Sequence, residues 1–129
     1  MRNCSLLALS LLLWIGVPVS AQEARFSKQY DACMNARDAR NGVQSAMNDC
    51  AQKEYSRQDD RLNTLWKSVM QSRKPDQRTS LRLSQRRWIA SRDKICKSEE
   101  EYMGSLDIMI YYNCMTSETI KRTKFLIAQ

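Results

Sequence analysis

Apolar residues recur every three or four positions over most of the chain, and this spacing predicts amphipathic α-helices. Residues that interrupt helices are rare beyond position 21, where the only Gly and Pro residues are Gly42, Pro75 and Gly104. They divide the chain into a short first helix and three longer helices that follow one another in antiparallel order. The predicted boundaries are about 26–38, 43–72, 76–102 and 105–127.

The segment LDIMIYY, residues 106–112, has a second interpretation. A short apolar run of this kind can also be a buried β-strand. Its neighbours have helical spacing, however, and no second segment offers a convincing strand to pair with it. We therefore predict an all-α fold.

The first residues have the pattern of an export signal. Arg2 precedes an apolar run from Ser5 to Val17, and small residues up to Ala21 suit cleavage by signal peptidase. The run is shorter than the ~20 apolar residues of a membrane-spanning helix, although an uncleaved anchor is the alternative. We expect residues 1–21 to be removed after Ala21. Residues 22–129 would then form one domain, periplasmic or secreted, without a transmembrane segment.

Four cysteines follow the predicted signal: Cys33, Cys50, Cys96 and Cys114. An even number in a short exported chain indicates two disulfides. Of the three connectivities that four cysteines allow, we favour the local pairs 33–50 and 96–114, since each would fasten one helix to the next. Zinc held by four thiolates is the alternative, but the spacing lacks a CxxC-type pair.

Two polar residues occupy the apolar stripe of the predicted helix 76–102. Steps of three and four from Leu81 reach Gln85, Trp88, Arg92 and Cys96, although an amide and a guanidinium are costly to bury. Asp59 is similarly placed in helix 43–72, in a stripe with Tyr55, Leu62 and Trp66.

A short turn near Pro75 makes these two helices antiparallel neighbours, so that the numbers of facing residues add up to about 150. Asp59 then faces Arg92, and Asn63 lies near Gln85. We predict an Asp59–Arg92 ion pair with hydrogen bonds from Asn63 and Gln85 beside it. The alternative is that both charged side chains lie at the edge of the stripe and face water.

The composition argues against an enzyme and against a metal or cofactor. The sequence has no histidine, which is the commonest general base and metal ligand. Asp59 and Asp60 are adjacent, so on a helix they diverge by about 100° and cannot act as a facing acid and base. We expect no catalytic residue, no cofactor and no metal site. Trp66 and Trp88 lie in the apolar stripes and are interpreted as core residues.

The chain is basic, with a formal net charge of +7. Without Arg2 the charge is +6, from 20 Lys and Arg against 14 Asp and Glu. Basic residues recur at four-residue spacing in two helices and predict a surface for an anionic partner, such as lipid headgroups or wall polymers rather than nucleic acid. The alternative is an ordinary solvated helix surface. The candidate residues are Lys53, Arg57, Arg61, Arg82 and Arg86.

The chain resembles the family of LprI-type lysozyme inhibitors over about residues 30–126. The resemblance rests on Asp59 followed by DRLNTLW (60–66), on QRRWIASRDKIC (85–96) and on GSLDIMIYYNCMTSETIKRTKFL (104–126). Trp66 stands where the family more often has Tyr. The resemblance supports the helical fold and implies a polar seam between the helices. Its members are Asp59, Asn63, Gln85, Trp88, Arg92 and Arg122.

For function, the resemblance implies a lysozyme inhibitor that acts by protein–protein contact, with a lysozyme as its partner. It provides no motif for the residues that touch the enzyme. The alternatives are a cationic envelope protein that binds anionic lipid or wall polymers, and a protein that neutralises another secreted effector.

Overall fold

The computed structural model describes residues 26–97 and 104–129, and within these ranges the chain is helical with no strand. The all-α prediction is confirmed, and residues 106–112 are helical. The predicted signal peptide and its cleavage site lie outside the described residues. The helix predicted at 76–102 ends at Cys96, earlier than expected, and residues 98–102 lie outside the described ranges. The helices are α1 (Lys28–Met34), α2 (Arg37–Arg40), α3 (Gln44–Ser72), α4 (Pro75–Cys96) and α5 (Ser105–Ile127).

The predicted first helix, 26–38, is in fact two short helices. Ser27 caps α1, because its hydroxyl accepts the N–H of Tyr30 at 3.1 Å. Gly42 then provides the turn into α3 with a φ of +81°, a conformation that glycine adopts without steric cost.

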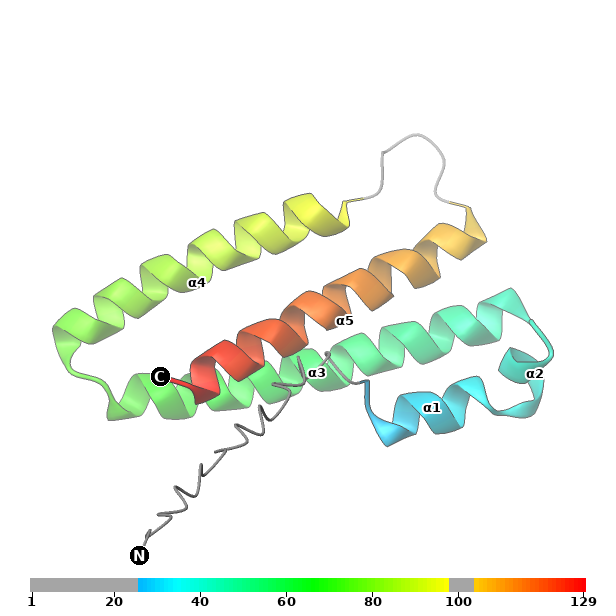
Figure 1. Ribbon diagram of the computed structural model, residues 1–129, viewed down its shortest axis with the longest axis horizontal. Helices are drawn as coiled ribbons and strands as arrows, with labels where there is room; N and C mark the ends of the chain where they lie inside the picture. The colour runs from blue at the N-terminus through cyan, green and yellow to red at the C-terminus, as the bar shows by residue number, and fades with distance from the viewer. Residues whose placement is uncertain (1–25, 98–103) are drawn as a thin grey trace, which may run out of the picture.

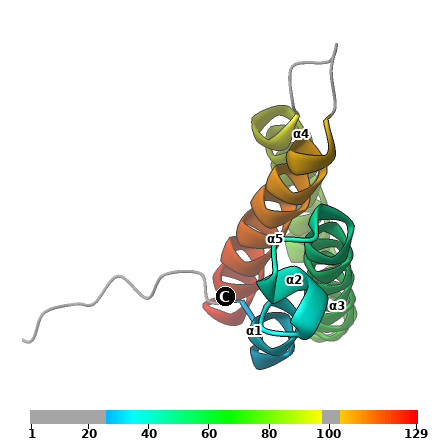
Figure 2. The same ribbon diagram turned by 90° about the vertical axis from the view of Figure 1, so that its right-hand side faces the viewer.

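α5 lies between α3 and α4 (Figures 1 and 2). It runs in the same direction as α3 and packs along that helix more extensively than any other pair of helices does, whereas α4 contacts mainly α5. The expectation that α3 and α4 face each other along their length is therefore wrong. They are antiparallel and joined by a short turn, but α5 occupies the space between them.

The residues of α5 explain this order. Its buried face combines apolar and small polar side chains, which allow close approach to α3, whereas α4 buries only Leu81 and Cys96. The inward face of α4, with Gln85 and Arg92, is a poor cover for an apolar groove. The buried residues of α5 are Met115, Thr116, Thr119, Ile120, Arg122, Thr123 and Leu126.

An apolar cluster joins the three long helices. Leu62 of α3, Leu81 of α4 and Leu126 of α5 form its centre. Partly buried residues pack around them, among them Trp66 and Trp88, which agrees with the interpretation of these two tryptophans as core residues. The surrounding residues are Leu65, Trp66, Val69, Met70 and Trp88.

Two disulfides cross-link the helices, and they are the two local pairs that were favoured. Cys33–Cys50 ties α1 to α3 with its Cα atoms 5.7 Å apart, and Cys96–Cys114 ties the last residue of α4 to α5 at 5.5 Å. The alternative of zinc bound by four thiolates is thereby ruled out. Because α4 buries so little, its position depends strongly on the second bond.

Replacing Cys96 and Cys114 together by serine should lower the free energy of unfolding by about 3 kcal/mol. It should also accelerate amide hydrogen exchange in α4 while α3 and α5 stay protected, since those two helices pack on each other independently of the bond. Replacing Cys33 and Cys50 is the matched control and should leave exchange in α4 unchanged. Equal acceleration of α4 in both variants would contradict this account.

Candidate functional site

Trp88 of α4 stands beside two guanidinium groups. The guanidinium carbon of Arg92 lies 5.0 Å from the ring centroid, and that of Arg122, from α5, lies 5.8 Å away. A cation near an aromatic face is attracted by the ring quadrupole, more strongly where water is excluded. The inward polar residues of α4 are thus organised around a tryptophan.

Arg122 is buried, with 6% of its surface exposed. Its Nε donates to Gln85 Oε1 at 2.8 Å and its Nη2 to Ser84 Oγ at 3.1 Å, while its guanidinium carbon lies 4.5 Å from the Phe125 ring centroid. No carboxylate forms an ion pair with it among the described residues, and burial lowers its pKa. Neutral partners and aromatic rings therefore stabilise this charge, and the contacts join α5 to α4.

The predicted Asp59–Arg92 ion pair is not formed. Arg92 instead pairs with its neighbour Asp93, Nη2 to Oδ1 at 2.8 Å, and Asp59 Oδ2 accepts from Asn63 Nδ2 at 3.0 Å. The contact of Arg92 across to α3 is with the hydroxyl of Tyr55, at 3.5 Å. The rule that the numbers of facing residues add up to about 150 placed Arg92 near the correct part of α3, but it predicted Asp59 instead of Tyr55 as the partner.

Tyr55 accounts for this difference. Its ring packs against Tyr112 of α5, with the centroids 5.9 Å apart, so an aromatic pair lies where direct contact between α3 and α4 was assumed. Burial raises the pKa of the Tyr55 phenol; the charge of Asp59 adds to the rise, and that of Arg92 opposes it. Asp59 and Arg92 thus approach the same phenol without meeting each other. Of the six seam residues, Gln85, Trp88, Arg92 and Arg122 gather on α4 and α5, and Asp59 and Asn63 form a separate pair.

A buried carboxylate that the sequence analysis missed lies on α3. Glu54 is fully buried and accepts hydrogen bonds from the Ser27 N–H at 2.8 Å, from the Ser27 hydroxyl and from Gln58 Nε2 at 2.8 Å. Arg57 adds an ion pair at 3.1 Å. Burial raises the pKa of Glu54, but these hydrogen bonds outweigh it and hold the pKa below its ordinary value. Glu54 thus anchors the segment before α1 to α3.

The residue spacing contained a signal for Glu54. Cys50, Glu54, Gln58 and Leu62 lie four residues apart, and all four are buried. Asp59 belongs to the neighbouring row, which begins at Tyr55 and lies about 100° further around the helix than the row of Glu54. The polar member of the buried stripe is therefore Glu54.

The predicted basic surface is divided between two helices. Arg57 is held by Glu54, whereas Lys53 and Arg61 are exposed and form no hydrogen bond or ion pair with any described residue. Lys53 and Arg57 are each two residues from Tyr55, which faces α4, so they lie on nearly the opposite side of α3. The candidate basic residues therefore form two rows, and Arg82 and Arg86 belong to the row on α4.

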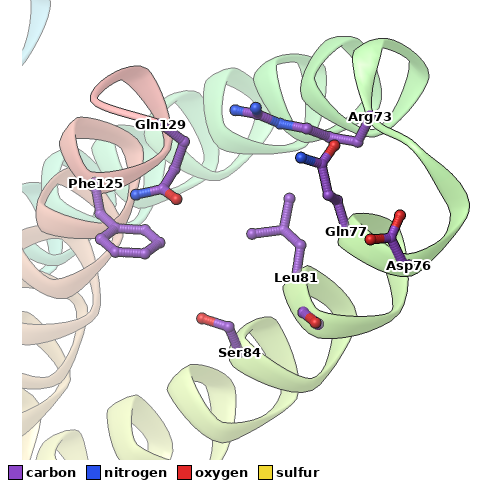
Figure 3. A pocket seen from close by; sticks show the side chains of 8 residues that line it. Arg73, Asp76, Gln77, Leu81, Ser84, Phe125 and Gln129 are labelled. Carbon is purple, nitrogen blue, oxygen red and sulfur yellow. The ribbon is translucent and has the colours of Figure 1, made fainter.

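A cleft of about 390 Å³ opens between the start of α4 and the end of α5 (Figure 3). Phe125 and Gln129 face Leu81 and Ser84 across it. Asp76 is the carboxylate side chain among the described lining residues, so the cleft has no facing pair of carboxyl groups for acid–base catalysis. The lining residues are Arg73, Asp76, Gln77, Ser80, Leu81, Ser84, Phe125 and Gln129.

The described ranges, 26–97 and 104–129, contain neither a metal-binding cluster nor a membrane-spanning helix. No group of three or more His, Cys, Asp or Glu side chains is arranged there to hold a metal ion. No helix in those ranges is both long and apolar enough to cross a membrane. The site described by the structure is thus a set of polar and aromatic contacts that position α4, with free arginines on its outer side.

Glu54→Gln should lower the free energy of unfolding at neutral pH by roughly 1–3 kcal/mol, because an amide cannot accept all the hydrogen bonds that the carboxylate accepts. Asp59→Asn makes the same chemical change on a partly exposed residue and should cost under about 0.5 kcal/mol. Urea titration of both variants measures the difference. A larger loss for Asp59→Asn would refute the assignment of Glu54 as the anchor.

The same pair of variants tests the ionisation of Glu54. A pKa below the ordinary value of 4.5 means that the charged carboxylate stabilises the fold above that pH and that its contribution is lost as the pH falls through the lowered pKa. The difference in stability between the original protein and Glu54→Gln should therefore shrink on acidification below about pH 4.5. A difference that grows instead would mean that burial raises the pKa of Glu54 overall.

Comparison with known proteins identifies the family. The model of the family described as "Lysozyme inhibitor LprI" matches residues 33–126, which include α3, α4, all of α5 but its last residue, and all four cysteines of the disulfides. No curated protein and no solved structure shows significant similarity to the chain. Because the family match covers most of the sequence, this chain belongs to the LprI family of lysozyme inhibitors.

Proposed function

We propose that this protein is exported and inhibits a lysozyme by binding to it as a folded domain. Membership of the LprI family is the observation that carries the proposal. An inhibitor needs no nucleophile or general base of its own. This requirement fits a chain without histidine whose four cysteines beyond residue 21 are joined in disulfides.

Glycoside hydrolases of the lysozyme type cleave between two carboxyl groups in a cleft. An arginine side chain presents a planar set of donors that matches a carboxylate with two parallel hydrogen bonds. A domain cross-linked by Cys33–Cys50 and Cys96–Cys114 would lose little conformational entropy when it binds. These properties support inhibition by occupation of the cleft.

The net charge sets a condition on this mechanism. Many lysozymes are themselves basic, and residues 22–129, with a formal charge of +6 from 20 Lys and Arg against 14 Asp and Glu, would be repelled by them at long range. Binding would therefore depend on close contacts between arginines and the acidic cleft, which are less screened by salt than the long-range repulsion is.

Export is part of the proposal. Residues 1–21 have the pattern of a signal peptide, and residues 22–129 would be the mature single domain. The two disulfides support an oxidising compartment such as the periplasm or the exterior, where they would persist. A lysozyme encountered by a bacterial envelope would be found in the same compartment.

The proposal is tested by the rate at which animal and bacterial lysozymes clear a peptidoglycan suspension. Oxidised protein comprising residues 22–129, in molar excess, should reduce the rate of at least one enzyme in a dose-dependent manner. An unrelated cross-linked domain of equal net charge serves as the control for substrate coating. Unchanged rates for every lysozyme tested, or equal inhibition by the control, would disprove the function.

A further inference from the structure

α4 is at the edge of the molecule. It packs against α5 on one side, and α3, α1 and α2 lie beyond α5 (Figures 1 and 2). Since its buried residues are only Leu81 and Cys96, most of its circumference is exposed. This helix therefore forms a convex ridge along the molecule.

The exposed side of this ridge carries free arginines. Arg82, Arg86 and Arg87 are exposed, and none of them forms an ion pair or hydrogen bond with the part of the chain that the structure describes. No Asp or Glu occurs between Asp76 and Asp93, so no acidic side chain on this stretch of α4 offsets them. Their charges are available to a partner.

An apolar side chain lies among these arginines. Leu83 is 47% exposed, and Arg86 and Arg87, three and four residues further on, are its neighbours on the helix surface. Arginine is enriched at the energetically important positions of protein–protein interfaces, and Leu83 adds an exposed apolar contact beside these arginines. We call Arg82, Leu83, Arg86 and Arg87 the outer face of α4.

A hollow adjoins this outer face. It has a volume of about 300 Å³ and is lined by Met70, Gln71, Arg78 and Arg82. Arg78 donates from Nη2 to the Gln71 carbonyl at 3.4 Å, but its Nε is buried without a hydrogen-bond partner. Arg78 and Arg82 therefore place two cationic side chains at the wall of this hollow.

We propose that the outer face of α4, together with the hollow at Arg78, is the surface that binds a carboxylate-bearing partner protein. This inference rests on the proposed function and names the part of the inhibitor that enters the acidic cleft of the lysozyme. A convex helix fits a concave cleft, the arginines pair with its carboxylates, and Leu83 supplies apolar contact. The basic row on α3 is not part of this surface.

Two triple variants with the same loss of charge separate this surface from net charge. Arg82→Gln, Arg86→Gln and Arg87→Gln are combined in one protein, and Lys53→Gln, Arg61→Gln and Lys67→Gln in the other. All six residues are exposed and have no partner in the described ranges, so both proteins should fold, and thermal unfolding followed by circular dichroism checks this.

The inhibition constant for the lysozyme should rise at least tenfold in the α4 variant and less than twofold in the α3 variant. The apparent KM for peptidoglycan should rise with the original inhibitor while kcat is unchanged, as expected for occupation of the cleft. An equal rise of the inhibition constant in both variants, or full inhibition by the α4 variant, would overturn the inference.

A second measurement keeps the inference testable if the original protein inhibits no lysozyme. Binding of poly-L-glutamate to each immobilised protein, followed at several salt concentrations, probes the surface without any enzyme. A loss of affinity at least threefold larger in the α4 variant than in the α3 variant would support an acidic protein as the partner of α4 although the proposed function had failed. Equal affinities in the two variants would overturn the inference.

Discussion

The packing of α5 along α3 is the contact on which the rest of the fold depends. It buries small and apolar side chains of α5 against α3 and leaves α4 to be held from the other side of α5. Specific groups attach two further helices to this pair: Cys33–Cys50 and Glu54 attach α1, and the leucine cluster, Arg122 and Cys96–Cys114 attach α4. α4 is thus positioned by a small number of directional contacts at separate points along its length.

Two buried charges of opposite sign are stabilised in different ways. Glu54 is surrounded by donors and by Arg57, so its charged form is favoured in spite of burial. Arg122 has an amide, a hydroxyl and two aromatic rings as neighbours, and it stays charged because a guanidinium hardly loses its proton in proteins. Both lie where one element is joined to another, and directional hydrogen bonds there select one arrangement of the helices over others.

Local patterns in the sequence were sufficient for the helices and the disulfides. Gly42 and Gly104 fall between helices and Pro75 is the first residue of α4, and the local cysteine pairs follow from the order of the helices. Which helices pack against each other could not be predicted from local patterns. A short turn makes α3 and α4 antiparallel, but it does not prevent a third helix from packing between them, and that outcome depends on the small residues Thr116 and Thr119 of a distant segment.

The error over Asp59 has the same origin. Asp59 and Glu54 lie on adjacent rows of one helix, and choosing between the rows requires the direction from which α5 approaches. The outer face of α4 could not be predicted from the sequence either, because the spacing of arginines does not show which of them form ion pairs with carboxylates. Arg57 and Arg82 both belong to rows of basic residues at four-residue spacing. In the folded chain Arg57 forms an ion pair with Glu54, whereas Arg82 forms none with a described residue.

The disulfide between Cys96 and Cys114 also makes the position of α4 depend on the redox conditions of the compartment in which the protein folds. Under reducing conditions the end of α4 would be connected to α5 only through the intervening chain, and the ridge that carries the free arginines would be less firmly oriented. A copy that stayed in the reducing cytosol would therefore present these arginines less accurately than an oxidised copy. For a protein exported as proposed, oxidation after translocation would complete the proposed binding surface outside the cytosol.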